Sequence, residues 1–234
     1  ADFNAALADR EVRAIMASIG GEDQIRVVPY LDPRLLREDP KPFLGYSDNT
    51  NILNWFWTNG VAGFYGGSTQ VHLGPGPRVD PEHLVSLTAA LVNGGGARVK
   101  GPGEPWAWAG PSRAVTGRTW GGCLEVIDWL ALAGRMPTDE DLAGAILLLE
   151  TSEDLPPPRM VRWWVRALGE RGVLAAVAGV LVARPPASAL GAPTPTTDER
   201  AAWRAAQRDA VIQEILAYNP EAVICVGPPF GHTR

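Results

Sequence analysis

Three side chains suited to nucleophilic catalysis each follow a short apolar segment. Ser47 follows an apolar pair and a glycine, Glu150 ends a run of leucines, and His232 follows an apolar segment and a double proline. In open α/β folds, ligands bind at the carboxyl ends of strands, so polar groups just after predicted strands are candidates for a site. A serine, a carboxylate and a histidine in this chain order are the possible nucleophile, orienting group and base of a catalytic triad.

The residues around Ser47 predict a strand, a sharp turn and a helix. An apolar run ends in Gly45, and Asp48 and Asn49 then open a stretch of aromatic and aliphatic residues. A serine on such a turn lies beside backbone N–H groups at a helix N-terminus, which can stabilise an oxyanion. The pattern resembles the nucleophile elbow of serine hydrolases, although Asn49 stands where Gly-x-Ser-x-Gly has its second glycine. The alternative is that Ser47 or Asp48 only caps the helix.

A pair of glycines offers a second set of backbone donors. Gly20 and Gly21 follow the predicted strand 15–19. Their N–H groups can complete an oxyanion hole together with the N–H of Asp48, because glycine lets a backbone come close to a ligand. An ordinary glycine turn remains the alternative.

The carboxylate and the histidine also have structural alternatives. Glu150 can cap a following helix or pair with an arginine, and His232 can be a surface residue near the end of the chain. Two further histidines compete for the role of base. His83 falls within a predicted helix and is expected to face solvent, whereas His72 stays open as a competitor.

Three tryptophans lie near the end of a glycine-rich and proline-rich segment, residues 94–110, or shortly after it. Trp106, Trp108 and Trp120 can stack on a planar group of a substrate, although packing in a core or interface is the commoner role of tryptophan. The segment itself is expected to be an interdomain linker or a mobile loop.

The composition limits the classes of partner. The chain has 234 residues, of which 46% are hydrophobic and 20% charged, with a net charge of −5. This is an ordinary soluble composition, with no sign of a nucleic-acid-binding or membrane-binding surface and no apolar stretch long enough to span a bilayer. We expect a cytoplasmic protein. The first residue is Ala1 rather than methionine, so a leader can have been removed.

The cysteines and histidines do not suggest a metal or cofactor. Cys123 and Cys225 lie far apart in apolar contexts, which favours buried free thiols over a disulfide, although a disulfide stays open. With three histidines and no paired Cys/His spacing, we expect no structural zinc.

Apolar segments alternate with helical patterns along the chain, which predicts an α/β fold with a parallel sheet covered on both faces. We expect an N-terminal α/β domain over 1–93, a linker or mobile loop over 94–112 and a C-terminal domain over 113–234. The predicted strands are 15–19, 42–45, 61–65, 145–149, one within 173–182, and 222–226. The predicted helices are 2–9, 33–38, 51–59, 81–92, 123–133, 158–169 and 198–217.

Several stretches together resemble a family of serine peptidases, the LD-carboxypeptidases and microcin C immunity proteins. They occur in the order of the family and span almost the whole chain. The matching stretches are Ser18–Gly21, Pro29–Asp32, Lys41–Asp48, Gly117–Glu125, Leu149–Glu153 and Gly231–Thr233.

The resemblance implies a role for each candidate residue. It makes Ser47 the nucleophile and assigns Glu150 and His232 to the remainder of a triad. The oxyanion hole would use the N–H of Asp48 and one N–H from Gly20 or Gly21. It also implies a Rossmann-like N-terminal domain, a smaller C-terminal α/β domain with a barrel-like sheet, and a homodimer.

Within the family, the stretches 117–125 and 149–154 are more similar to the microcin C immunity branch. That branch cleaves the amide between an aminoacyl group and a modified nucleotide and uses an aromatic residue near the base, for which Trp120 is the first candidate here. Murein tetrapeptide LD-carboxypeptidase is the alternative activity, and a non-catalytic ligand-binding α/β module is the second alternative. The family's opening βα units have no counterpart before Ala1, and its residues after the histidine have none beyond Arg234, so we expect that the sequence omits residues.

Overall fold

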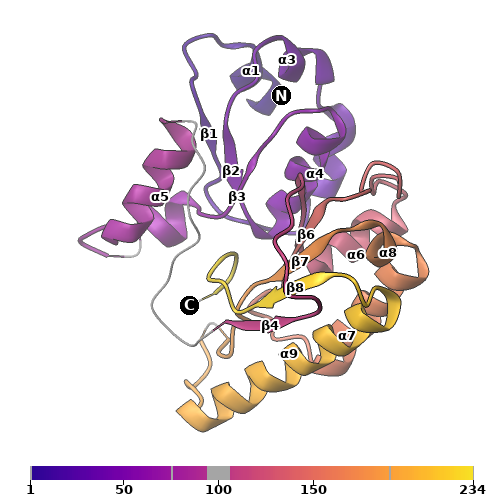
Figure 1. Cartoon of the computed structure of the whole chain (residues 1–234). Helices are drawn as coiled ribbons and strands as arrows, with labels where there is room; N and C mark the ends of the chain where they lie inside the picture. The colour runs from indigo at the N-terminus through magenta and orange to yellow at the C-terminus, as the bar shows by residue number, and fades with distance from the viewer. Residues whose placement is uncertain (1, 75, 94–105, 190, 234) are drawn as a thin grey trace. The chain divides into compact units, whose positions relative to one another are not determined.

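The computed structural model describes residues 2–74, 76–93, 106–189 and 191–233. The chain divides into two compact units, Ala1–Arg98 and Val99–Arg234, and each is described by itself (Figure 1). Of the predicted linker, 94–112, the part over 94–105 lies outside the described residues.

The first unit contains a three-stranded parallel sheet in the order β1-β2-β3, as predicted. Its strands are β1 (Ile15–Met16), β2 (Phe43–Gly45) and β3 (Phe64–Tyr65). The first strand is shorter than its predicted range because the chain changes partners after Ala17. The carbonyls of Ala17 and Ser18 accept hydrogen bonds from Thr69 and Gln70 and not from β2.

Short helices surround this sheet (Figure 1). They are α1 (Asp2–Ala8), α2 (Gln24–Val27), α3 (Pro33–Glu38), α4 (Thr50–Thr58) and α5 (Pro81–Leu91), with single-turn helices at Val28–Tyr30, Ser47–Asn49 and Thr69–Leu73. The predicted helices 33–38, 51–59 and 81–92 are thereby confirmed. Phe43 of β2 and Phe56 of α4 pack at 5.5 Å between ring centroids, and both are fully buried. This contact fixes β2 against α4 and therefore holds the turn between them.

The second unit contains a five-stranded sheet in the order β4-β8-β7-β6-β5 (Figure 1). Its strands are β4 (Ala107–Ala109), β5 (Thr119–Cys123), β6 (Ile146–Glu150), β7 (Gly179–Val182) and β8 (Val223–Val226). Among these described strands, β4 pairs antiparallel with β8, and β5, β6, β7 and β8 pair parallel with one another in sheet order. The α/β class with parallel sheets is confirmed. The strands in the described part of this unit form an open sheet and not a closed barrel, and this unit is the longer of the two.

The helices of the second unit are α6 (Leu124–Leu132), α7 (Pro158–Glu170), α8 (Val173–Ala176) and α9 (Thr197–Tyr218). α9 begins with a reciprocal cap, in which the Thr196 hydroxyl accepts from the N–H of Glu199 and the Glu199 carboxylate accepts from the N–H of Thr196. The predicted helices 123–133, 158–169 and 198–217 are confirmed within one residue at each end. Within the described ranges, none of the helices has the length and apolar composition needed to cross a membrane.

Two elements of this unit, α8 and β5, were not predicted from the sequence. The apolar strand expected within 173–182 is β7 at 179–182, and residues 173–176 before it form the short helix α8. Gly172 adopts a φ of 93°, which starts a new helical turn after α7. Strand β5 was not predicted because its two glycines are poor strand formers. A Cβ on Gly121 would overlap the backbone carbonyl of Leu148, so the close pairing of β5 with β6 requires glycine.

The parallel register brings chemically active side chains to one edge of the sheet. Cys123 at the end of β5 is paired in register with Glu150 at the end of β6. β8 ends at Val226 in register with Val182 of β7, and the chain then leads through the turn that carries His232. Cys123, Glu150 and His232 therefore lie close together at this edge.

Candidate active site

Ser47 occupies a strained turn between β2 and α4. Tyr46 is extended, and Ser47 then adopts a φ of 64°, in the left-handed region. Among the described residues only Leu155 is another non-glycine residue with positive φ. Such a conformation costs roughly 1–3 kcal/mol and is maintained only where the surroundings enforce it. The predicted order of strand, sharp turn and helix is confirmed, and it is the geometry that exposes a hydroxyl at the end of a strand.

The glycine loop of the first unit lies directly against Ser47. A Cβ built on Gly20 would be 2.7 Å from Ser47 Oγ and 3.6 Å from the backbone nitrogen of Asp48. The N–H of Ser47 donates to the Tyr65 hydroxyl at 3.4 Å. The backbone at Gly20 and the N–H of Asp48 therefore both lie near the Ser47 hydroxyl, in a space that only glycine leaves open.

The side chain of Asp48 has a structural role. Its carboxylate is buried and accepts hydrogen bonds from the N–H of Gln24 at 3.1 Å and from Asn51 Nδ2 at 2.8 Å. Burial raises the pKa of Asp48, although these hydrogen bonds act against the increase. Asp48 thus ties the beginning of α2 to the beginning of α4, and this contact holds the turn in place.

His72, the competing base, is engaged within the first unit. Its Nδ1 accepts a hydrogen bond from the N–H of Ser68 at 3.0 Å, so this nitrogen carries no proton. The ring meets Tyr46 and His83 edge to face, with centroids 5.5 Å and 4.9 Å away. His83 is exposed on α5, as predicted.

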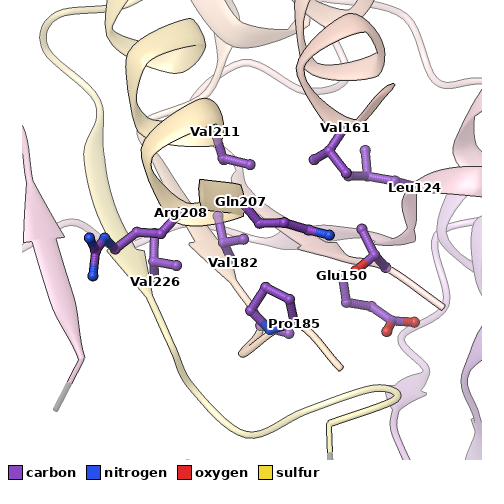
Figure 2. Close-up of a pocket in the computed structure, with 11 residues that line it drawn as sticks. Leu124, Glu150, Val161, Val182, Pro185, Gln207, Arg208, Val211 and Val226 are labelled. Atoms are coloured by element: carbon purple, nitrogen blue, oxygen red, sulfur yellow. The ribbon is translucent and has the colours of Figure 1, made fainter. Parts of the chain in front are cut away.

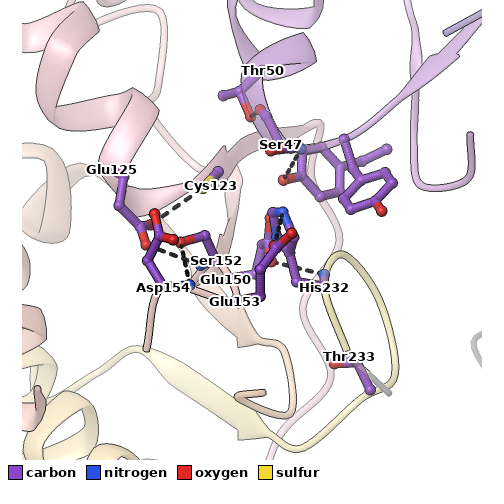
Figure 3. Close-up of polar contacts among 12 residues, drawn as sticks. Ser47, Thr50, Cys123, Glu125, Glu150, Ser152, Glu153, Asp154, His232 and Thr233 are labelled. Atoms are coloured by element: carbon purple, nitrogen blue, oxygen red, sulfur yellow. Dashed lines mark hydrogen bonds and ion pairs between the residues drawn. The ribbon is translucent and has the colours of Figure 1, made fainter. Parts of the chain in front are cut away.

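In the second unit, Glu150 and His232 form a buried pair (Figure 3). His232 Nδ1 lies 2.9 Å and 2.8 Å from the two carboxylate oxygens of Glu150, and the His232 N–H donates to Glu150 Oε2 at 3.0 Å. Gly231 makes this approach possible. Its φ is 69°, and a Cβ at this position would overlap the Glu150 carboxylate.

A second carboxylate, which the sequence analysis did not identify, contacts the other ring nitrogen. His232 Nε2 lies 3.0 Å from Glu153 Oε2. Burial by itself lowers the pKa of His232, but the hydrogen bonds to Glu150 and Glu153 outweigh burial and raise the pKa to about 10. The ring in this structure is therefore an imidazolium at neutral pH. It can act as a base only when Nε2 is released from Glu153.

The loop that carries Glu153 is tied to the first turn of α6. The N–H of Ser152 donates to Glu125 Oε1 at 2.9 Å, and the Cys123 thiol donates to Glu125 Oε2 at 3.2 Å (Figure 3). Burial, followed by the charges of Glu150 and Glu125, raises the pKa of the Cys123 thiol well above its usual range. Cys123 is thus a protonated thiol and not a nucleophile. The sequence contained one signal for the role of Glu153: it is a second glutamate, three residues after Glu150 at the end of β6.

A small cavity lies behind Glu150 (Figure 2). Its volume is about 10 Å³, and Leu124, Val161, Val182 and Val211 supply much of its wall. Such a cavity has room for about one water molecule and none for a substrate. The buried hydroxyl of Thr151, which also lines it, has no hydrogen-bond partner among the described residues. The cavity is lined in part by Glu150 and is too small to be a substrate pocket.

The three candidate tryptophans differ in exposure. Trp120 on β5 is 3% exposed, Trp108 on β4 is 65% exposed, and Trp106 just before β4 is partly exposed. Their role in binding stays a prediction. By exposure, Trp108 presents the most open ring to a ligand.

The fold and these groups define a two-unit α/β protein, with a strained serine turn in one unit and a buried Glu–His pair in the other. The profile of the LD-carboxypeptidase N-terminal domain matches residues 1–66, and that of the LD-carboxypeptidase C-terminal domain matches residues 116–234. The chain belongs to the LD-carboxypeptidase family, peptidase S66, as the sequence resemblance predicted.

Curated relatives match parts of the chain. A Vibrio cholerae protein named as a carboxypeptidase is 30% identical over 174 residues, which are 64% of this chain and 51% of that protein. The microcin C7 self-immunity protein MccF of Escherichia coli is 33% identical over 66 residues, or 28% of this chain and 19% of that protein. The chain thus spans about half the length of the first relative.

Solved structures share the fold. An MccF-like protein from Streptococcus pneumoniae in complex with AMP has a TM-score of 0.73 at 22% identity, over 99% of this chain and 74% of that chain. MccF in complex with aspartyl sulfamoyl adenosine has a TM-score of 0.71 at 20% identity, over 99% of this chain and 71% of that chain. An MccF-like protein from Bacillus anthracis has a TM-score of 0.72 at 22% identity, over 100% of this chain and 72% of that chain. At these identities the likeness establishes the fold.

The Gly231 contact gives a first testable prediction. Gly231→Ala should move His232 away from Glu150 and lower the pKa of His232, because the new methyl overlaps the carboxylate. Removing this buried contact should also lower the free energy of unfolding by roughly 1–3 kcal/mol beyond the cost of backbone strain. Gly134→Ala is the matched control, since Gly134 has a φ of 65° and no atom near its Cβ position. Equal losses of unfolding free energy in urea for the two variants would contradict the prediction.

The contact with Glu153 gives a second prediction. NMR titration of the His232 ring should show protonation persisting far above pH 6.5, toward about pH 10, and Glu153→Gln should lower that pKa. Because the folded-state pKa is raised, the associated stability is fully present below pH 6.5 and is lost as the pH rises toward about 10. The difference in unfolding free energy between wild type and Glu153→Gln should therefore shrink over this range.

Asp154→Asn is the control for this titration. It removes the neighbouring carboxylate but leaves both partners of the His232 ring in place. A His232 pKa near 6.5 in the wild type, or an equal decrease in both variants, would show that Glu153 does not hold the proton.

Proposed function

We propose that the protein is a serine peptidase in which Ser47, Glu150 and His232 are nucleophile, orienting carboxylate and base. The observation that carries the proposal is the buried Glu150–His232 pair, with Nδ1 of the histidine held by both carboxylate oxygens. Such a pair fixes the ring orientation and leaves Nε2 as the nitrogen that can accept a proton from a nucleophile. The strained turn at Ser47 supports the choice of nucleophile.

The proposed reaction begins when His232 Nε2 takes the proton of the Ser47 hydroxyl. Oγ then attacks the carbonyl carbon of an amide, and the N–H of Asp48 with that of Gly20 or Gly21 stabilises the resulting oxyanion. The imidazolium of His232 gives its proton to the leaving amine, and Glu150 offsets the positive charge of the ring. Water, activated by the same histidine, then releases the acyl group from Ser47.

Glu153 sets a condition on this sequence of steps. Nε2 is the nitrogen that must accept the proton from Ser47, and in this structure Glu153 occupies it. The Glu153 side chain is 31% exposed, so it can turn toward solvent. The reactive state therefore requires that Glu153 move away and that the imidazolium lose one proton.

We propose an aminoacyl-nucleotide as the substrate class, with cleavage of the amide between its aminoacyl and nucleotide parts. The support is that MccF structures hold glutamyl sulfamoyl guanosine and aspartyl sulfamoyl adenosine. Release of a terminal residue from a murein tetrapeptide is the second candidate, and the carboxypeptidase name of the Vibrio cholerae relative favours it. A non-catalytic binding module is the third candidate. A reactive Ser47 would exclude it, and an unreactive Ser47 would favour it.

The remaining expectations are part of the same proposal. They are a division into domains at 1–93 and 113–234, a homodimer, a cytoplasmic location, and catalysis without a cofactor.

The role of Ser47 is tested by kinetics. Ser47→Ala and His232→Ala should each lower kcat by roughly 10⁴–10⁶, and the double variant should be little worse, because the two groups act as a unit. A fluorophosphonate should label the wild type and not Ser47→Ala. Ser86→Ala and His83→Ala are matched controls, since both residues are exposed on α5. Wild-type turnover by Ser47→Ala would exclude covalent catalysis at this residue.

Substrate choice is tested with two substrates and two tryptophan variants. An aminoacyl sulfamoyl adenosine should be cleaved faster than a murein tetrapeptide. Trp108→Ala should raise KM for the nucleotide substrate, because stacking on a base contributes roughly 1–3 kcal/mol and Trp108 is the exposed candidate. Trp163→Ala is the control, as Trp163 is an exposed tryptophan of α7. Efficient release of D-alanine from the tetrapeptide, with no cleavage of the nucleotide, would reject the proposed substrate and leave the triad in place.

A further inference from the structure

Cys123, Glu150 and His232 form a compact set of three different metal ligands. One thiol sulfur, one carboxylate oxygen and one ring nitrogen all lie within 4.8 Å of one another, and all three residues are buried. They come from the end of β5, the end of β6 and the turn after β8. All three belong to the second unit, so the set does not depend on the first.

The donor types suit a borderline or soft divalent cation. Zinc binds thiolate, imidazole and carboxylate at about 2.0–2.3 Å, so neighbouring ligands in a tetrahedral site are about 3.3–3.6 Å apart. The ligand atoms here lie within 4.8 Å and therefore need only small side-chain rotations to close on an ion. A thiolate ligand disfavours Mg²⁺ and Ca²⁺, which prefer oxygen.

Neighbouring groups can complete and orient this set. Glu125 Oε2 accepts from the Cys123 thiol at 3.2 Å, which places a second carboxylate beside the sulfur as a fourth ligand or as an orienting partner. Glu153 contacts the other nitrogen of the His232 ring at 3.0 Å. A carboxylate on the distal nitrogen is a common partner of a metal-bound histidine, because it fixes the orientation of the ring.

We propose that Cys123, together with Glu150 and His232, forms an inhibitory binding site for Zn²⁺ or Cd²⁺. On binding, the thiol and the imidazolium each lose one proton to water, and the ion takes their place between sulfur, nitrogen and carboxylate oxygen. The ion withdraws His232 and Glu150 from proton transfer. The inference of metal binding rests on the clustering of the three ligand atoms. The inference of inhibition rests in addition on the proposed peptidase function.

Metal binding is measured directly on the full chain after removal of metals with a chelator. Calorimetric titration with Zn²⁺ should give one equivalent bound, and Cd²⁺ should produce a thiolate-to-metal charge-transfer band in the ultraviolet. Cys123→Ser should lose the band and weaken Zn²⁺ binding at least tenfold. Cys225→Ser is the matched control, because Cys225 is the other buried cysteine and is also outside any disulfide, and it should behave as wild type. No band in the wild type, or loss of the band in Cys225→Ser alone, overturns the proposal.

A measurement on the wild type covers the case in which Cys123→Ser does not fold. Co²⁺ should give a thiolate charge-transfer band and should shift and broaden the ring signals of His232 but not those of exposed His83. A spectrum without thiolate ligation, or unchanged His232 signals at saturation, overturns the proposal.

Inhibition is then tested with the substrate that the wild type cleaves. Zn²⁺ should inhibit wild type and Cys225→Ser, a chelator should restore their activity, and Cys123→Ser should need at least tenfold more Zn²⁺. Equal sensitivity of Cys123→Ser and wild type overturns the inhibitory site. Ser47→Ala separates metal binding from the peptidase function. This variant should bind Zn²⁺ as wild type does. If it keeps full activity, the peptidase assignment is rejected and the metal site is not.

Discussion

The buried contact between Glu150 and His232 is the interaction on which the proposed chemistry of this chain depends. Two charged groups are removed from water here, and such a pair is tolerated only when hydrogen bonds satisfy both partners. The structure supplies them through both carboxylate oxygens, the backbone N–H of His232 and the second carboxylate of Glu153. The sheet and its turns have to hold these groups closely, which explains the glycine at position 231, where any side chain would displace Glu150.

The contacts of His232 with Glu150 and Glu153 favour stability but oppose reactivity. Two carboxylates on one imidazole hold its pKa at about 10, which stabilises the folded second unit but leaves the ring without a free basic nitrogen. A general base works best when its pKa is near the working pH. In the proposed reaction, release of Glu153 lowers the pKa of His232 and uncovers Nε2 in one step. Glu153 is partly exposed whereas Glu150 is buried, so Glu153 is the partner that can move away in the proposed reaction.

The first unit shows strain of a different kind. Ser47 has a backbone conformation that costs free energy, and packing around it offsets this cost. Phe43 and Phe56 hold β2 against α4, and the buried Asp48 carboxylate ties the beginnings of α2 and α4 together. Gly20 then lies against the Ser47 hydroxyl with no room for a side chain. Rigid packing thus keeps the hydroxyl and the nearby backbone N–H groups in one arrangement.

The sequence by itself determined the local and periodic features. Apolar runs ending in glycine or polar residues specified β2, β6 and β8, and the residues around Ser47 specified its turn, since these depend on neighbours along the chain. Only the tertiary structure decided which distant groups meet. Strand β5 exists because Gly121 lets β6 approach, and Glu153 and Cys123 join His232 because parallel strands end at one edge. Such contacts depend on register and burial between segments far apart in the chain, and a pattern along the sequence does not contain them.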